Sequence, residues 1–448
     1  MLTRRDMVGA GAALAATLAM PAVAAPAGAP DRFVRRNGTG FTRAGRPYRY
    51  AGANLWYGAW LGSSAPSGDR PRLLRELDAL AALGVTNLRV LASSEDSPLK
   101  HSIKPAFRNA GSVWNPALLD GLDFLLAEMG KRGMKAVLYL TNFWEWSGGM
   151  MTYLSYVNGG TYIDMGDPAH PWPEFPDAVA QFYATPAATA LYDDWIRAVV
   201  GRTNAVTGTP YRDDPTIMAW QFANEPRPGG SDAVAVPLLP AFYAWTHASA
   251  KLIKSLDPNH LVCTGNEGLK GSIERAEVYK TAHAFAEIDY CTAHIWPLNW
   301  GWVDARDIPA TNEAALIKVR EYIAQHVALA TELGKPLVIE EFGYPRDGGG
   351  YDPESSTHFK DAYYRLIYDA VEAGAKAGGP IAGSNFWAWN GKGRAAHGDH
   401  RYQPGDDYLG DPPHEPQGWY GVFDSDTGTK AVIAAHAKAL AEIEATAG

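Results

Sequence analysis

Two glutamates stand at the ends of strongly apolar segments, where a charged side chain is costly unless it has a function. Glu225 ends the segment 217–225, and Glu341 follows the run Leu-Val-Ile-Glu at 337–340. Segments this apolar and rich in β-formers predict buried strands. Two carboxylates on separate strands can act as an acid/base and a nucleophile, the pair that retaining hydrolysis of a glycosidic bond requires.

The strands that would position these glutamates alternate with helical segments along the chain. The strand candidates are residues 49–56, 86–91, 135–142, 217–225, 261–267, 290–296, 336–343 and 383–389. Amphipathic helices are expected at residues 71–83, 117–132, 240–255, 311–333 and 429–445. This alternation predicts an α/β fold, a (β/α)8 TIM barrel, in which the C-terminal ends of all eight strands meet on one face. We therefore expect Glu225 and Glu341 to lie close together on that face.

Three long insertions follow strands and should lie on the same face, where they would build a cleft. They cover residues 92–114, 144–175 and 391–417. Loops after barrel strands carry the functional groups of this architecture. No segment has the composition of a linker or an appended module, so residues 25–448 are expected to form one catalytic domain.

The composition excludes several classes of partner. The 448 residues are 46% apolar and carry a net charge of −9, which argues against a nucleic acid or an anionic membrane surface as partner. Fifteen Trp and 22 Tyr suit the stacking of sugar rings, although aromatic side chains are also ordinary core material.

Residues 1–24 have the pattern of a twin-arginine-type signal peptide. Arg4 and Arg5 precede an apolar, Ala-rich stretch that ends in the cleavage-site pattern Ala-Val-Ala at 22–24. A membrane anchor is the alternative, but the stretch is short and is followed by Pro26 and Pro30. We expect an exported protein, periplasmic or extracellular, with no membrane anchor after processing.

The two cysteines, Cys263 and Cys291, each lie in an apolar run, so buried free thiols are expected and a disulfide is the alternative. The insertion 391–417 is rich in histidines and aspartates, which are candidate metal ligands. Those residues are His397, His400, Asp406, Asp407, Asp411 and His414. They lack a recognised metal-ligand spacing, so a cleft-lining loop is the better interpretation, and no metal or cofactor is expected.

Seven motifs, in chain order, make the sequence similar to glycoside hydrolase family 5, and within it to the bacterial β-mannanase branch. They are Gly-Ala-Asn-Leu-Trp-Tyr at 52–57, Asn-Leu-Arg at 87–89, Thr-Asn-Phe-Trp at 141–144, Asn-Glu-Pro at 224–226, His-Ile-Trp-Pro at 294–297, Glu-Phe-Gly at 341–343 and Phe-Trp-Ala-Trp at 386–389. The resemblance implies retaining hydrolysis of β-1,4-mannosidic linkages in a polysaccharide or oligosaccharide, with Glu225 as acid/base and Glu341 as nucleophile.

Arg89 and Asn224 are expected beside the two glutamates. Arg89 ends the second strand and can hold Glu341 charged and oriented; a structural ion pair is the alternative. The negative charge of Glu341 should in turn raise the pKa of Glu225 and keep it protonated at rest. The resemblance makes Asn224 a partner of the sugar 2-hydroxyl, with a turn-forming role as the alternative.

The remaining predicted substrate-binding residues are a histidine and several aromatic residues. His294 and Trp296 share one face of the sixth strand, and the resemblance makes His294 a hydrogen-bonding partner of the carboxylates. Many relatives carry Tyr where Trp296 stands, so its indole N–H could donate instead. Trp387 is expected to stack on the sugar at the cleavage point. Weaker candidates for contacts at other subsites, with core packing as the alternative, are Trp56, Tyr57 and Trp144.

Glu340 directly precedes the proposed nucleophile. Adjacent strand residues point to opposite faces, so only one of Glu340 and Glu341 should enter the barrel mouth. The Glu-Phe-Gly motif selects Glu341, and Glu340 is then expected to face the helix layer or a salt bridge.

Three other functions were weighed. A β-1,4-glucanase would use the same catalytic motifs, and an exo-acting enzyme would result if the insertion 144–175 closed one end of the cleft. A carbohydrate-binding barrel without catalysis is disfavoured by the intact pair Glu225 and Glu341. We expect a monomer.

Overall fold

The computed structural model of the chain describes residues 32–446, which contain one eight-stranded parallel sheet. Its strand order is β8-β7-β6-β5-β4-β11-β10-β9. The strands are β4 Tyr50–Asn54, β5 Asn87–Leu91, β6 Lys135–Tyr139, β7 Ile217–Gln221, β8 Leu261–Cys263, β9 Cys291–Ile295, β10 Leu337–Phe342 and β11 Ile381–Phe386. Each lies in a segment predicted as a strand or overlaps it.

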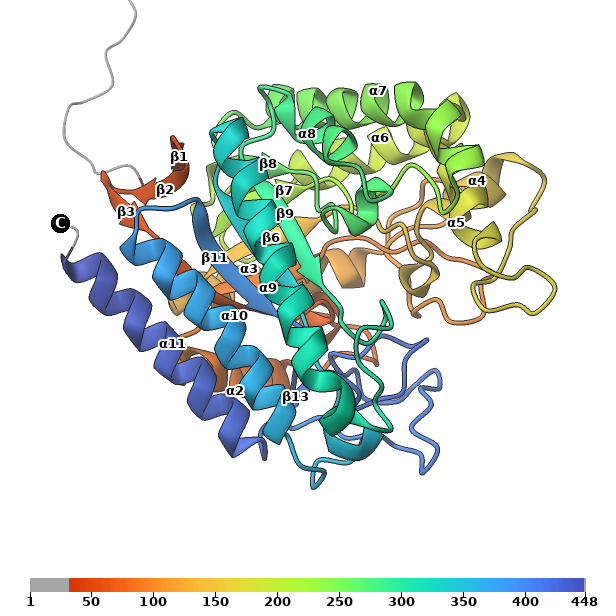
Figure 1. Cartoon of the computed structure of the whole chain (residues 1–448). Coiled ribbons are helices and arrows are strands. Elements are labelled where there is room, and N and C mark those ends of the chain that lie inside the picture. Colours follow the sequence, from red (N-terminus) through yellow and green to blue (C-terminus); the bar gives the residue numbers. More distant parts are fainter. Residues whose placement is uncertain (1–31, 447–448) are drawn as a thin grey trace, which may run out of the picture.

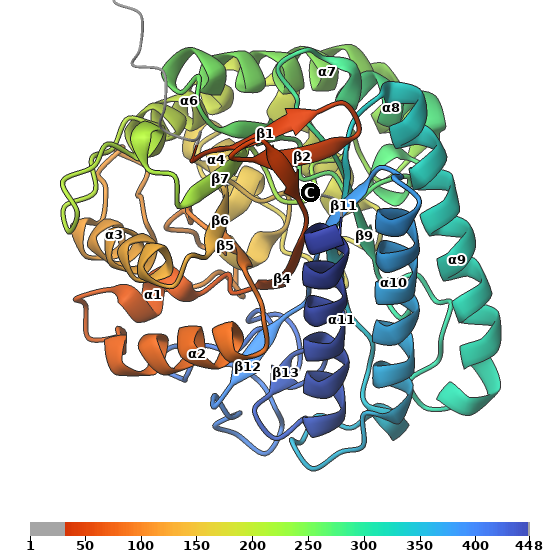
Figure 2. The same cartoon turned by 90° about the vertical axis from the view of Figure 1, so that its left-hand side faces the viewer.

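The sheet curls into a nearly closed barrel. A parallel bridge between Cys263 and Tyr290 joins β8 to the start of β9, and the N–H of His294 donates to the carbonyl of Glu267 over 2.9 Å. Helices surround the strands, as Figure 2 shows from one end of the barrel. The predicted (β/α)8 TIM barrel is confirmed.

The helix layer contains the five predicted helices and others. The long helices are α2 Arg70–Ala82, α3 Pro116–Lys131, α6 Pro186–Val200, α7 Asp232–Leu256, α9 Ile308–Leu333, α10 His358–Lys376 and α11 Thr427–Thr446; the shorter ones are α1 Gly58–Gly62, α4 Gly149–Val157, α5 Glu174–Val179 and α8 Ala276–Ala284. Helix α7 begins at Asp232, earlier than predicted, because it tolerates Pro237 and Pro240 in its interior. The sequence predicts a start at Pro240, which lies inside the helix in the structure.

A small antiparallel sheet covers the N-terminal end of the barrel (Figure 2). It consists of β1 Val34–Asn37, β2 Gly40–Arg43 and β3 Arg46–Tyr48. Its side chains Val34, Phe41 and Tyr48 join the bottom of the barrel in one buried cluster. The sequence did not predict these strands, because each is only three or four residues long and largely polar.

The three insertions lie beyond the C-terminal ends of the barrel strands, on the right-hand side of Figure 1. The insertion 391–417 runs between the short strands β12 Trp389–Gly391 and β13 Val422–Phe423. Cys263 and Cys291 are buried free thiols, as predicted. Within residues 32–446, no helix combines the length and apolar character needed to cross a membrane. The signal-peptide prediction for residues 1–24 lies outside the described residues.

Candidate active site

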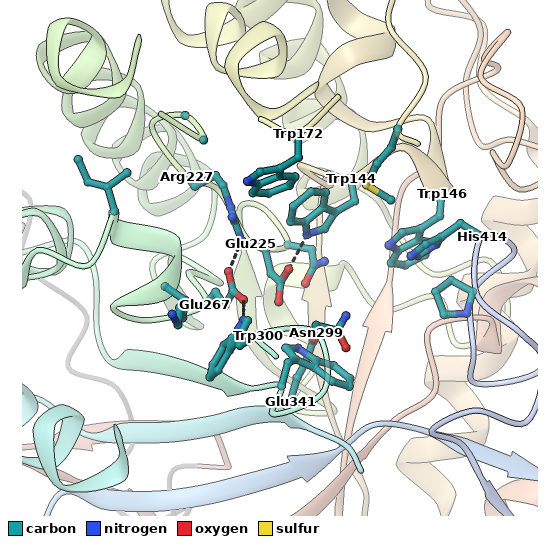
Figure 3. A pocket seen from close by; sticks show the side chains of 18 of the residues that line it. Trp144, Trp146, Trp172, Glu225, Arg227, Glu267, Asn299, Trp300, Glu341 and His414 are labelled. Carbon is teal, nitrogen blue, oxygen red and sulfur yellow. Dashed lines mark hydrogen bonds and ion pairs between the residues drawn. The ribbon is translucent and has the colours of Figure 1, made fainter. Parts of the chain in front are cut away.

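A pocket of about 640 Å³ opens on the C-terminal face of the barrel. Both Glu225 and Glu341 line it, and Figure 3 shows their carboxylates facing the same space. Aromatic rings form much of the remaining wall: Trp144, Trp146, Trp172, Trp296, Trp300 and Trp387. A concave, aromatic pocket with a few convergent charged groups is typical of a small-molecule or sugar site.

The two glutamates are close enough to act on one bond. One side-chain atom each from Glu225, His294 and Glu341 lies within 4.8 Å of the other two. Retaining glycosidases hold their carboxyl groups about 5–5.5 Å apart, whereas inverting enzymes need about 6.5–9.5 Å to admit a water molecule. This close approach of the two carboxylates fits double displacement.

Glu225 has an unusual backbone conformation. It follows β7 with a φ of +50°, in the left-handed region that residues other than glycine rarely occupy. Its N–H donates to the carbonyl of Gly265 over 2.8 Å, which fixes this conformation. Backbone strain of this kind occurs at functional sites, where the surrounding structure enforces it.

Arg89 organises the floor of the pocket. Its guanidinium is fully buried and donates to Glu341, to Asn224 Oδ1 over 2.5 Å and to Gln221 Oε1 over 2.8 Å. Asn224 in turn donates to Asn142 over 3.0 Å. The charge-assisted contact orients Glu341, and the sequence predicted Arg89 at this carboxylate.

Glu340 also points into the barrel, contrary to the expected alternation. The pairing between β10 and β9 shifts register between Ile339 and Glu341, because Ile339 pairs with Ala293 and Glu341 with the next residue, His294. Such a bulge places one extra residue in the strand and re-aims its side chains. Glu340 is fully buried, 3.8 Å from Arg89 Nε. The sequence predicts that Glu340 faces either the helix layer or a salt bridge. The structure shows the salt bridge, with Arg89 as the partner.

His294 lies between the carboxylates. Its Nδ1 is 2.6 Å from Glu225 Oε1 and 3.3 Å from Glu341 Oε2, and its Nε2 is 3.8 Å from Glu340 Oε2. Burial alone would lower the pKa of the imidazole, but the charge of Glu341 and the contacts with Glu225 and Glu340 raise it well above its usual range.

The pKa of Glu225 moves opposite to the sequence expectation. Burial would raise it, but the hydrogen bond and positive charge of His294 lower it to about 2. The expected effect of Glu341 is outweighed because His294 is a closer and oppositely charged neighbour. Glu225 and His294 thus share one proton, which rests on the imidazole side of their hydrogen bond.

The structure brings several predicted substrate-binding residues into the pocket. Asn224, Trp144, Trp296 and Trp387 line it. The Trp144 indole donates to Glu225 Oε2. No hydrogen bond joins the Trp296 indole to Glu341 among the described residues; the Trp296 ring instead packs against Trp387, with ring centres 6.0 Å apart.

Trp56 and Tyr57 belong to the core, so the expectation that they contact a sugar is wrong. Trp56 is 1% exposed and donates to Gly410 O, and Tyr57 is fully buried and donates to Trp389 O. Trp389 donates to Glu76 over 2.8 Å and lies outside the pocket lining. Core packing was the alternative given for Trp56 and Tyr57. It applies because helices and loops cover both side chains.

An ion pair beside Glu225 was missed by the sequence analysis. Arg227 donates to Glu267, whose other oxygen accepts from Trp300 Nε1 over 3.0 Å (Figure 3). Burial raises the pKa of Glu267 to about 7, against the opposing charge of Arg227. The signal was available, since Glu267 ends the predicted strand 261–267 much as Glu225 ends its own segment.

Other missed residues come from the insertions and from the loop after β9. They are Trp146, Trp172, Asn299, His414 and Glu415. The insertions were expected to build a cleft, but sequence alone could not select the side chains that face it.

The histidines and aspartates of the insertion 391–417 do not converge. His397 pairs with Asp406 over 3.1 Å, His400 lies 3.5 Å from Asp352, and Asp411 accepts backbone N–H groups. Among residues 32–446, the only side chains that bring together three atoms able to bind a metal ion are Glu225, His294 and Glu341.

Comparison with known proteins is decisive at this point. A family model described as GH family 5 beta-mannosidase-like matches residues 31–445. The chain belongs to glycoside hydrolase family 5. It is 35% identical to the glycoside hydrolase family 5 mannosidase from Rhizomucor miehei, with a TM-score of 0.85, over 94% of this chain and all of that one. A mutant of that mannosidase has been solved in complex with mannosyl-fructose.

Curated relatives from plants extend this family 5 assignment. Mannan endo-1,4-beta-mannosidase 1 of Oryza sativa subsp. japonica is 30% identical over 370 residues, which cover 79% of this chain and 78% of the relative. Mannan endo-1,4-beta-mannosidase 5 of Solanum lycopersicum is 30% identical over 369 residues, covering 79% and 80%.

Proposed function

We propose that this family 5 protein hydrolyses β-1,4-mannosidic linkages with retention, with Glu341 as nucleophile and Glu225 as acid/base. The observation that carries the proposal is the close approach of the two carboxylates, within 4.8 Å, across one pocket. The mannoside substrate is supported by the names of the relatives, which are mannosidases and mannan endo-1,4-beta-mannosidases.

In the first step a Glu341 oxygen attacks the anomeric carbon while the bond to the leaving oxygen breaks. That oxygen takes up the one proton that Glu225 and His294 share, which passes from the imidazolium through the Glu225 carboxylate and leaves His294 neutral and Glu225 ionised. A covalent glycosyl ester and a free hydroxyl result. In the second step Glu225 removes a proton from water, the water oxygen bonds to the anomeric carbon, and the ester bond to Glu341 breaks.

The surrounding residues have defined roles in this scheme. Arg89 orients Glu341 for attack, and Asn224, which accepts a hydrogen bond from Arg89, binds the 2-hydroxyl in this scheme. Trp387 and Trp296 stand at right angles, with planes 80° apart, and supply apolar surface for the sugar that is cleaved.

A second candidate function is an exo-acting enzyme, which cleaves the polysaccharide from one of its ends. This candidate is favoured because the two ends of the pocket are unequally buried. Beside Glu225, where a leaving group must lie, Asp232, Glu274 and Trp172 are exposed. At the other end, next to Trp146 and His414 (right in Figure 3), Trp146 and Glu415 are only 2% and 7% exposed. The wall on this side comes mainly from the insertion 391–417, with Trp146 from the insertion 144–175.

Product analysis tests both candidates. Linear mannan, mannohexaose and carboxymethylcellulose would be digested with the wild type, and products followed over time. Hydrolysis of the mannans alone supports the proposal, and activity only on the glucan overturns the substrate. Mixed oligosaccharides at early times indicate internal cleavage, whereas mannose or mannobiose from the start indicates a chain-end enzyme. Proton NMR should detect the β anomer first, and the α anomer would overturn retention.

We also propose that the protein is exported through the twin-arginine pattern at residues 1–24 and acts as a monomer. The arginine pair, the apolar stretch and the Ala-Val-Ala pattern support export. Fractionation of expressing cells with a lysine-for-arginine variant at Arg4 and Arg5 tests export, and sedimentation tests the oligomeric state.

A further inference from the structure

Glu340 is a buried carboxylate in the barrel mouth that the proposed mechanism does not use. We propose that Glu340 is a positioning residue: it holds His294 in its cationic form and thereby fixes the proton that His294 shares with Glu225. Glu340 would then set the pH range over which the enzyme works. This inference rests on the proposed function, because it assigns a role only if Glu225 is the acid/base.

The bulge in β10 is what makes this role possible. A regular strand would direct Glu340 and Glu341 to opposite faces, with one of them outside the barrel. The register shift between Ile339 and Glu341 brings both carboxylates inside, one on either side of Arg89. Two negative charges so close together need cations, and Arg89 supplies only one.

His294 supplies the second cation. Its Nε2 faces Glu340 Oε2 at 3.8 Å, while its Nδ1 faces Glu225 at 2.6 Å. The Nε2 atom is buried and has no hydrogen-bond partner among the described residues, so Glu340 is the group that compensates a proton there. Opposite charges within about 4–6 Å favour the charged form of a group.

Neutral groups hold Glu340 in place. Gln221 Nε2 donates to Glu340 Oε2, and the Tyr290 hydroxyl donates to Oε1 over 3.2 Å. Gln221 also accepts from Arg89, so one amide ties the carboxylate to the guanidinium. Glu340 therefore keeps a fixed distance from His294.

Charged and neutral titratable groups both surround Glu340. The groups that face it are Arg89 from β5, Tyr50 from β4, Cys263 from β8, Tyr290 before β9, His294 from β9 and Glu341 from β10. Burial raises the pKa of Tyr50, Cys263 and Tyr290 well above their usual ranges. These three groups stay neutral, whereas the proton shared by His294 and Glu225 responds to the charge of Glu340.

The sign of the effect follows from electrostatics. The negative charge of Glu340 raises the pKa of any neighbouring group, because it favours the protonated form. Loss of that charge would lower the pKa of the pair His294 and Glu225, which sets the alkaline limb of the kcat/KM profile. The alkaline limb should therefore move to lower pH.

The test compares wild type, E340Q and E340D with mannobiose as substrate. Glutamine keeps the shape and an acceptor oxygen but removes the charge, so the alkaline limb should move down by about one pH unit. Aspartate keeps the charge but withdraws it from His294, so its alkaline limb should lie between the other two. Alkaline limbs that coincide with that of the wild type would overturn the proposal. If E340Q does not fold, as judged by circular dichroism, E340D against wild type decides the same question.

A second substrate separates this effect from a structural one. The leaving group of 2,4-dinitrophenyl β-mannoside needs no proton, so kcat/KM for it should have no alkaline limb from Glu225 and His294 in any of the three proteins. An alkaline limb that shifts equally on both substrates would overturn the proposal. Wild type without activity on any mannoside would instead refute the proposed function.

Discussion

The two ends of this barrel bury side chains equally well but for different purposes. At the end covered by β1–β3, Met218 and Val338 have no exposed surface and belong to an apolar cluster. At the other end Arg89, His294 and Glu340 are just as deeply buried, yet all three can carry charge. The apolar end is stabilised by the area it removes from water, and the polar end by mutual pairing of its charges.

This contrast teaches what an irregular strand does at each end. The strand pairing shifts register at the apolar end too, beside Met218 and Val338, but only apolar side chains are affected there. At the polar end the bulge turns Glu340 inward, and Glu225 has a positive φ. Conformations of this kind persist where many contacts enforce them, and they occur where function requires particular side-chain directions. Changes at the polar end should therefore affect chemistry, and changes at the apolar end stability.

The largest expected effect is at Glu341. The variant E341A should lose at least about 10³-fold in kcat/KM on mannobiose, because no nucleophile remains. Added azide should restore turnover of 2,4-dinitrophenyl β-mannoside and yield an α-mannosyl azide, since the small anion fits the vacated space. The matched control is E321A, a glutamate exposed on α9. A loss below tenfold in E341A would contradict the assignment of the nucleophile.

At the apolar end, a substitution of Met218 should reduce stability and leave activity nearly unchanged. The variant M218A should lower the free energy of unfolding by about 2–5 kcal/mol, because it leaves a cavity in a fully buried cluster. Urea denaturation would measure this loss, and kcat/KM at 25 °C should stay within about twofold of wild type. A large loss of activity in folded M218A would show that the two ends are coupled.

Acid should destabilise the fold through histidines of the helix layer. Burial lowers the pKa of His283 to about 3 and of His326 to about 4. Both pKa values lie below the pKa of a histidine in the unfolded chain. Between about pH 6.5 and 4 the unfolded chain therefore binds protons that the folded chain does not. Each should reduce the free energy of unfolding by about 1.4 kcal/mol per pH unit in that range.

Urea denaturation at pH 7 and pH 5 checks this prediction. His294 should not contribute to the loss, because its pKa is raised and its charged form is stabilised by the folded protein. In H326N the fall in stability between the two pH values should be smaller than in the wild type. An equal fall in both proteins would contradict the role of His326.

The smallest expected effect is at the exposed rim of the pocket. Trp172 is 62% exposed and stacks on Trp144, with ring centres 6.5 Å apart. In W172A, KM for mannopentaose should rise about fivefold, since an aromatic contact contributes about 1 kcal/mol. KM for 4-nitrophenyl β-mannoside should be unchanged. The control is Y162A, an aromatic of the same insertion outside the pocket lining; an equal effect there would contradict a specific subsite at Trp172.

The sequence predicted the barrel well because its strands and helices have local signals. Each predicted strand is a short segment rich in apolar and β-forming residues, and helices such as α9 have a continuous periodic face. The sheet β1–β3 escaped notice because its strands are too short to form a pattern. Trp56 and Trp387 both stand near strand ends, and only the loops packed over them decide that one is buried in the core and the other lines the pocket.

The sequence by itself determined the barrel, the two glutamates at strand ends and Arg89 beside them, because periodicity and the cost of burying charge are properties of short segments. The tertiary structure decided where the shared proton rests, because His294 and Glu225 lie 2.6 Å apart but on different strands. It also decided that Glu340 faces inward, since a bulge depends on the pairing between β9 and β10. Such distances between remote segments are set by packing of the whole chain, which no local pattern encodes.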